Sequence, residues 1–76
     1  MELTFGEKLK LLREETELNQ TELGKLLNMT QRKISYLERG QNEPSLQDIK
    51  AICTFFHVSA DYLLGFQKPL PYPRRK

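Results

Sequence analysis

The chain has 76 residues, of which 38% are hydrophobic and 29% charged, and its formal net charge is +2. A chain of this length buries only about 60% of its unfolded surface, so we expect one compact domain without a deep active-site cleft. Its one cysteine excludes an internal disulfide, and no apolar run approaches the ~20 residues of a membrane span, so we expect a cytoplasmic protein with no membrane partner.

The positive charge is concentrated at the C-terminal end of the chain. Without four basic residues that stand there, eight basic residues oppose ten acidic ones, and the rest of the chain has a net charge of −2. These four residues are Lys68, Arg74, Arg75 and Lys76. Nucleic-acid binding therefore has to be argued from a local patch and not from the charge of the whole chain.

Capping residues mark the first two expected helices. Thr4 begins the pattern of a capping box and predicts a helix over about Phe5–Glu15, with an apolar face of Phe5, Leu9 and Leu12. Asn19 begins a similar pattern and predicts a helix over about Gln20–Leu27. The residues that we expect this second helix to bury are Leu23, Leu26 and Leu27.

A tight turn and a third helix follow. Asn28 tolerates the left-handed backbone conformation that such a turn often requires. Thr30 is the expected N-cap of the third helix, and Gly40 is its expected stop. Ile34 and Leu37 are expected to face the core.

Two more helices complete the expected fold. Ser45 and Asp48 predict the start of a fourth helix, whose apolar stripe consists of Leu46, Ile49, Ile52, Cys53 and Phe56. Ser59 is the expected cap of a short fifth helix that stops at Gly65. No strand pattern competes, so we predict an all-α, compact five-helix bundle.

The chain after the fifth helix has a different composition. Three prolines, Pro69, Pro71 and Pro73, exclude a continuing helix and favour an extended tail. We therefore expect a helical domain over residues 1–66 and a proline-rich basic tail over residues 67–76.

The two short helices around Asn28 have the spacing of a helix-turn-helix. The stretch from Leu18 to Gly65 resembles the phage-repressor and Cro type of helix-turn-helix, the Xre family, in the segments "LNQTELGKLLNMTQRKISYLERG", "PSLQDIKAIC" and "VSADYLLG". Gly24, where the family often has alanine, is small enough for close approach of the third helix. The resemblance implies a DNA-binding domain whose third helix enters the major groove of double-stranded DNA.

The resemblance also indicates which residues contact DNA. Gln31 has the donor and acceptor that match adenine, Arg32 has two donors for guanine, and Tyr36 lies one turn further along the same face. The expected base-contacting residues are therefore Gln31, Arg32, Tyr36 and Thr30. The expected phosphate contacts come from helix starts, basic side chains and the following loop: Gln20, Asn19, Lys33, Arg39, Gln41, Asn42 and Ser45.

Two contacts within the domain are implied in the same way. Gln20 is expected to brace Gln31. Arg13 and Glu38 match positions that form an ion pair between the first and third helices, although two solvated charges are the alternative.

No catalytic or metal site is expected. Cys53 and His57 share a helix face, but no second pair completes the four ligands that Zn²⁺ normally has, and no third catalytic residue accompanies them. We therefore expect structural roles for both residues, no cofactor, and no enzymatic activity.

The C-terminal part of the domain carries more apolar side chains than five short helices bury. These are Phe55, Tyr62, Leu64 and Phe66, and relatives often dimerise through this region, so we expect a homodimer. The sequence thus predicts a transcriptional regulator, expected to be a repressor, that binds two-fold symmetric operator DNA. The alternative is an antitoxin-like module that masks a protein partner through the same apolar surface.

Overall fold

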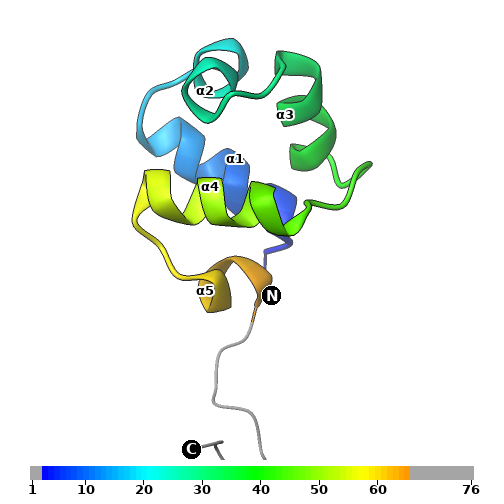
Figure 1. Cartoon of the computed structure of the whole chain (residues 1–76), viewed down its shortest axis with the longest axis vertical. Helices are drawn as coiled ribbons and strands as arrows, with labels where there is room; N and C mark the ends of the chain where they lie inside the picture. The colour runs from blue at the N-terminus through cyan, green and yellow to red at the C-terminus, as the bar shows by residue number, and fades with distance from the viewer. Residues whose placement is uncertain (1–2, 66–76) are drawn as a thin grey trace, which may run out of the picture.

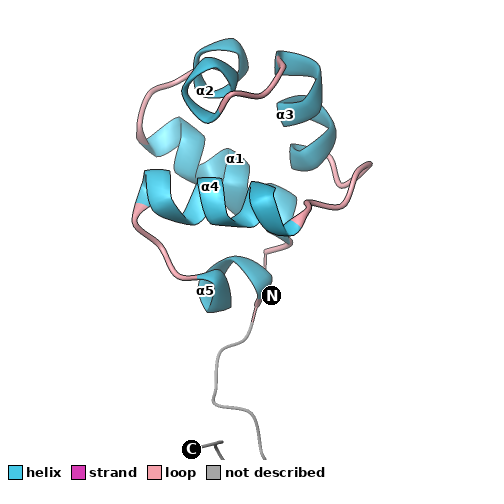
Figure 2. Ribbon diagram, viewed as in Figure 1, coloured by secondary structure: helices cyan, strands magenta, loops and turns pink. Residues whose placement is uncertain are grey.

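The computed structural model describes residues 3–65, and this part of the chain contains five helices and no strand. Figure 1 shows α2 and α3 at one end of the molecule, α1 and α4 in the middle and α5 at the opposite end. Short loops connect consecutive helices (Figure 2). The helices are α1 (Phe5–Glu15), α2 (Gln20–Leu27), α3 (Gln31–Glu38), α4 (Leu46–Phe56) and α5 (Ala60–Leu64). The all-α prediction is confirmed, whereas the proposed boundary at residue 66 and the proline-rich tail lie outside the described residues.

Every helix begins at the N-cap that the sequence predicts. The side chains of Thr4, Asn19, Thr30, Ser45 and Ser59 each accept a hydrogen bond from a backbone N–H in the first turn. The helices α1, α2 and α4 have complete capping boxes, in which a carboxylate also accepts from the N–H of the cap residue. These bonds satisfy donors that have no partner within the helix and so fix where each helix starts.

Left-handed residues end several helices. Asn28 has a φ of 61° at the end of α2, and Gly65 has a φ of 86° at the end of α5, as expected for these residue types. His57 has a φ of 58° at the end of α4, which makes it a backbone cap. The turn through Asn28 leads from α2 to α3, and the hydrogen bond from the N–H of Met29 to the carbonyl of Gly24 (2.7 Å) ties this turn to the end of α2.

The core is contributed by all five helices. Its buried side chains are Leu9, Leu23, Leu27, Ile34, Leu37, Ile52 and Leu63. Two predicted core positions are wrong: Leu26 is 56% exposed and Leu46 is 73% exposed. Leu23 and Leu27 already fill the inner stripe of the two-turn helix α2, and Leu46 is the first residue of α4, so neither side chain reaches the interior.

Two glycines allow unusually close backbone approach. A Cβ on Gly6 would lie 2.4 Å from the carbonyl oxygen of Glu38 and 2.6 Å from that of Leu37, so α1 abuts the end of α3. A Cβ on Gly24 would lie 2.5 Å from the carbonyl oxygen of Met29. Gly24 therefore makes room for the turn that leads into α3, which refines the expectation that it faces the third helix itself.

Within residues 3–65 no helix has both the length and the apolar character to cross a membrane.

Candidate nucleic-acid interface

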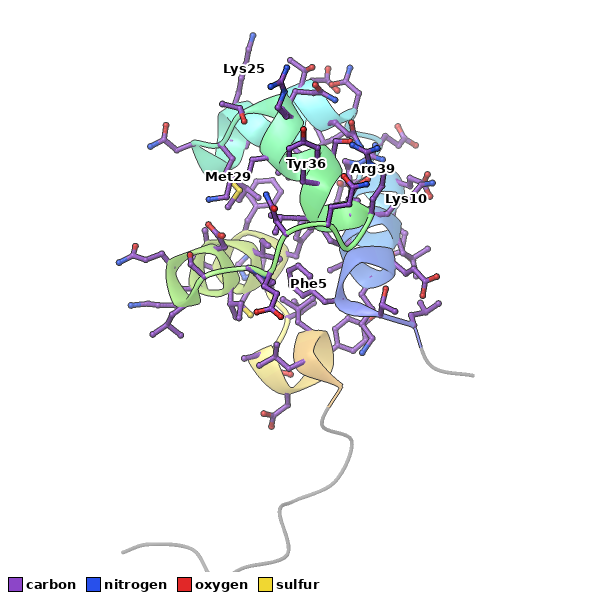
Figure 3. The ribbon with its side chains drawn as sticks, turned by 90° about the vertical axis from the view of Figure 1, so that its right-hand side faces the viewer. Phe5, Lys10, Lys25, Met29, Tyr36 and Arg39 are labelled. Carbon is purple, nitrogen blue, oxygen red and sulfur yellow. The ribbon has the colours of Figure 1, made fainter. Side chains whose placement is uncertain are left out.

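The helix α3 has a buried side and a polar side. Ile34, Leu37 and Glu38 are buried, with the two apolar residues at 0% and 1% exposure. The remaining residues of α3 and its two caps are exposed or half-buried, namely Thr30, Gln31, Arg32, Lys33, Ser35, Tyr36 and Arg39. Figure 3 looks onto this side of the molecule, with Tyr36 on α3 and Arg39 directly after the helix. Because Glu38 points inward, the charged side chains on the polar side are basic.

The buried Glu38 is the partner of Arg13. The Nε of Arg13 donates to Oε2 of Glu38 (2.6 Å) and Nη2 donates to Oε1 (3.1 Å), which gives a bidentate pair between α1 and α3. The two side chains are only 11% and 3% exposed. The hydrogen bond to Glu38 raises the pKa of Arg13 against the opposing effect of burial. Arg13 also donates through Nη1 to the carbonyl of Leu18 (2.9 Å), so one guanidinium joins α1, the α1–α2 turn and α3.

Two glutamines extend this network to the surface. Nε2 of Gln20 donates to Oε1 of Glu38 (3.0 Å), and Nε2 of Gln31 donates to Oε1 of Gln20 (2.6 Å). Gln20 thus braces Gln31 from the first turn of α2, which is the contact that the resemblance implied. A continuous chain of hydrogen bonds therefore runs from the buried ion pair to the exposed first residue of α3.

The start of α3 is tied to α4 by a second ion pair. Nζ of Lys33 lies 2.9 Å from Oδ1 of Asp48, whose other oxygen accepts from the N–H of Ser45 (3.0 Å). Burial pushes the pKa of Asp48 upward, but the hydrogen bonds from Ser45 and Lys33 outweigh it and leave the pKa below its usual value. Lys33, which the sequence suggests as a phosphate contact, is therefore already paired within the domain.

Tyr36 is supported by Arg39. The guanidinium of Arg39 lies 5.4 Å from the centre of the Tyr36 ring, and its Nε donates to the carbonyl of Ser35 (3.4 Å). A cation at this distance attracts the ring face. The contact holds Tyr36 on the polar side of α3, one turn after Arg32.

The other expected DNA-contacting residues surround α3. Thr30, Asn19 and Ser45 are exposed, and their side-chain oxygens cap α3, α2 and α4. Gln41 and Asn42 are exposed in the loop that follows α3. These residues thus lie at helix starts or in that loop, where backbone N–H groups are available to an anion.

One buried basic residue escaped the sequence analysis. Lys8 is only 7% exposed, and its Nζ donates to the carbonyl of Tyr62 (2.6 Å) and lies 5.0 Å from the centre of the Tyr62 ring. These contacts attach α5 to α1. A lysine on a charged amphipathic helix normally points into solvent, so no signal in the sequence indicates this role.

The expected dimer residues that the structure describes are located on two helices, α4 and α5. Phe55 is half-buried, packs edge-on against Phe56 with the ring centres 4.9 Å apart, and lines an open hollow together with residues of α2. Tyr62 and Leu64 are on α5 and are 42% and 45% exposed. Phe66 lies outside the described residues. Cys53 packs against the core, and its burial raises the pKa of the thiol.

A tight turn through Asn28 between two short helices, with a braced polar side on the second, defines a helix-turn-helix domain. A family model described as a helix-turn-helix domain matches residues 4–63, and the chain belongs to this family, which is of the phage-repressor type. It is 37% identical over 63 residues to the HTH-type transcriptional activator BcrR of Enterococcus faecalis, covering 83% of this chain and 31% of that protein. It is 32% identical over 60 residues to repressor protein C2 of Salmonella phage P22, covering 79% of this chain and 28% of the relative.

Solved structures agree with the family assignment. The crystal structure of the P22 c2 repressor in complex with a synthetic operator matches with a TM-score of 0.77 and 30% identity, covering 83% of this chain and 96% of that one. The hydroxypropylphosphonic acid epoxidase from S. wedmorenis matches with a TM-score of 0.70 and 28% identity, but over only 32% of its own chain. The chain spans only about a third of the length of BcrR and of repressor protein C2, covering 31% and 28% of these two proteins.

Proposed function

We propose that the protein is a sequence-specific transcriptional regulator, acting as a repressor, that inserts the first turns of α3 into the major groove of operator DNA. The observation that carries this proposal is the side chain of Gln31, which is exposed yet held by Gln20. An exposed glutamine on a solvated surface has no need of such bracing. A glutamine that makes a bidentate contact with a base benefits from a fixed orientation, because less side-chain entropy is lost on binding.

The distribution of charge supports the same surface. The chain without its C-terminal basic residues has a net charge of −2, but the polar side of α3 carries Arg32 and Arg39, together with Lys33, which is paired with Asp48. The acidic residue of α3, Glu38, is buried and paired with Arg13. The surface that would meet the phosphate backbone is therefore locally basic, which is the feature that sequence-independent attraction to DNA requires.

The contacts divide into base-reading and positioning contacts. We assign base reading to Gln31 and Arg32, with Tyr36 and Thr30 at the edges of the same surface. Phosphate contacts are assigned to the starts of α2 and α4 and to the loop after α3. They comprise Asn19, Gln20, Lys33, Arg39, Gln41, Asn42 and Ser45. The P22 c2 repressor, whose fold this chain shares, is itself found in complex with a synthetic operator.

We further propose that the protein binds as a homodimer. Tyr62 and Leu64 expose 42% and 45% of their surface on the short helix α5, at the end of the molecule opposite α2 and α3 (Figure 1). Self-association of two copies would cover these apolar side chains. A two-fold symmetric dimer would present two copies of α3 to half-sites about 34 Å apart, one turn of B-DNA.

The test is selection from a pool of random duplexes, followed by fluorescence anisotropy at several salt concentrations. The variant Gln31→Ala/Arg32→Ala removes the assigned base readers. The control Lys50→Ala/Thr54→Ala removes the same net charge from exposed positions on α4. We expect a two-fold symmetric sequence to be enriched and the first variant alone to lose at least about tenfold in preference for it, while weaker salt-sensitive binding remains. Absence of any enriched sequence, or an unchanged preference in the first variant, would contradict the proposal.

A further inference from the structure

In the hydrogen-bond chain that ends at Gln31, each group has a fixed role as donor or acceptor, and Glu38 determines these roles. The carboxylate of Glu38 receives two hydrogen bonds from Arg13, through Nε at 2.6 Å and through Nη2 at 3.1 Å. A guanidinium is a donor only, and a carboxylate paired with it is an acceptor only. Neither group can reverse its role, so any amide that contacts Glu38 has to donate.

Gln20 transmits this direction. Its Nε2 lies 3.0 Å from Oε1 of Glu38, and the opposite amide orientation would place two oxygen atoms, both acceptors, against each other. The carbonyl oxygen of Gln20 is consequently the group that faces Gln31. In general a glutamine amide has two nearly indistinguishable orientations, but here the chemistry of its neighbour permits one.

The same reasoning fixes Gln31. The carbonyl oxygen of Gln20 needs a donor, which Nε2 of Gln31 provides at 2.6 Å. One N–H and the carbonyl oxygen of Gln31 are left for a base. Adenine requires this combination in the major groove, because its N7 accepts and its N6 amino group donates.

We propose that Glu38 is a positioning residue for base recognition: through Gln20 it selects the amide orientation that Gln31 presents to an adenine. This inference rests on the proposed function, since it concerns the surface assigned to DNA. Glu38 is 8% exposed and faces the interior, so it acts on the base through the two glutamines. The buried ion pair thus contributes to specificity as well as to the attachment of α3 to α1.

The orientation can be tested first in the free protein. We would record the side-chain amide NMR signals of Gln20 and Gln31 in the wild type, in Glu38→Gln and in Gln20→Met. In the wild type the Gln31 amide hydrogen that is donated to Gln20 should have a shifted signal and slowed exchange with water, and it should lose both properties in the variants. Gln20→Met keeps both residues of the Arg13–Glu38 pair, so it tests the hydrogen-bond chain from Glu38 through Gln20 to Gln31 even if Glu38→Gln does not fold. Unchanged Gln31 signals in Gln20→Met would overturn the inference.

The effect on recognition is measured as a ratio of dissociation constants. The selected operator is compared with one in which the A·T pair opposite Gln31 is reversed. The ratio is the dissociation constant for the reversed duplex divided by that for the selected operator. We expect this ratio to be about tenfold or more in the wild type and to be smaller by a factor of at least about three in Gln20→Met and Glu38→Gln. The control Lys33→Met, which removes the other ion pair of α3, should weaken binding to both duplexes and leave the ratio unchanged.

A further variant separates the two proposals. If Gln31→Ala abolishes the ratio and Gln20→Met preserves it, Gln31 reads the base without orientation by Glu38, and only the inference fails. If Gln31→Ala also preserves the ratio, Gln31 does not read this base, and both the inference and the assignment of Gln31 as a base reader fail.

Discussion

Two ion pairs attach α3 to the rest of the domain within residues 3–65, and they differ in burial and geometry. The Arg13–Glu38 pair is bidentate, and its side chains are 11% and 3% exposed. The Lys33–Asp48 pair has one contact of 2.9 Å, and its lysine side chain is 42% exposed. Breaking a buried pair leaves an uncompensated charge in a poorly solvated site, whereas an exposed ammonium group is readily solvated again.

The difference suggests a division of labour along α3. Arg13 donates hydrogen bonds to Glu38 and to the carbonyl of Leu18, so its guanidinium stabilises the fold. Lys33 makes one contact with Asp48 and its side chain is 42% exposed, so in the proposed complex it would exchange Asp48 for a phosphate at modest cost. We expect the Arg13–Glu38 pair to fix the orientation of the helix, and the half-exposed lysine of the other pair to adapt in the proposed complex, although Asp48 itself is only 8% exposed.

The largest effect is expected from Glu38→Ala. The substitution leaves the buried guanidinium of Arg13 without its partner, and we expect the free energy of unfolding to fall by about 3–5 kcal/mol. Urea denaturation monitored by circular dichroism would measure it. Lys33→Ala is the matched control, with an expected loss of about 0–1 kcal/mol. Equal losses in the two variants would remove the distinction between the pairs.

Gly6→Ala tests the backbone contact that brings the buried pair together. The new Cβ would lie 2.4 Å from the carbonyl oxygen of Glu38, and backbone cannot move aside as a side chain can. We expect a loss of about 1–3 kcal/mol in unfolding free energy, typical of overpacking. Lys10→Ala, at an exposed position of the same helix, should change stability by no more than about 0.5 kcal/mol. A Gly6→Ala variant as stable as this control would show that the backbone of α1 can move away from the carbonyl oxygen of Glu38 without loss of stability.

Asp48→Asn tests the charge in the adaptable pair. Because the folded-state pKa of Asp48 is lowered, its ionised form stabilises the fold above the unfolded pKa of about 3.9, and this stabilisation disappears as the pH falls through the folded pKa. We expect Asp48→Asn to be about 1 kcal/mol less stable than the wild type at pH 7. The difference should shrink below about pH 4, as thermal unfolding across pH would show. A difference that is independent of pH would assign the effect to packing instead of charge.

The smallest effect on stability is expected from Lys33→Met. This variant should also show a changed salt dependence of DNA binding. Its unfolding free energy should change by less than about 1 kcal/mol, because the ammonium group is half-exposed. Loss of one phosphate contact should reduce the slope of log K against log salt by about 1, with little change in sequence preference. An unchanged slope would mean that Lys33 stays on Asp48 in the complex.

Much of the fold follows from short-range sequence patterns. The caps at Thr4, Asn19 and Ser45 and the left-handed turn at Asn28 depend on residues within one helical turn, and the structure has each where the sequence predicts it. Periodicity was less reliable at the edge of a stripe or the first residue of a helix. The periodicity predicts that Leu26 is buried, for example, whereas its side chain is 56% exposed.

The contacts that organise the candidate site are less accessible to such patterns. Lys8 meets Tyr62 across 54 positions of sequence, and Gly6 meets the backbone of Glu38. Nothing local distinguishes these residues from an ordinary surface lysine or a weak helix former. Lys33 illustrates the converse, since its local pattern suggests a DNA contact and only the approach of α4 reveals Asp48 as its partner.

The most direct test of α3 as the DNA-reading element is NMR shift mapping of the isotope-labelled protein with the selected operator duplex. We predict that the largest backbone and side-chain shifts fall on residues 30–39 and on the start of α2, with the Gln31 side-chain amide among them. Shifts concentrated on α4 and α5 instead, with residues 30–39 unchanged, would contradict the assignment of α3 as the recognition helix.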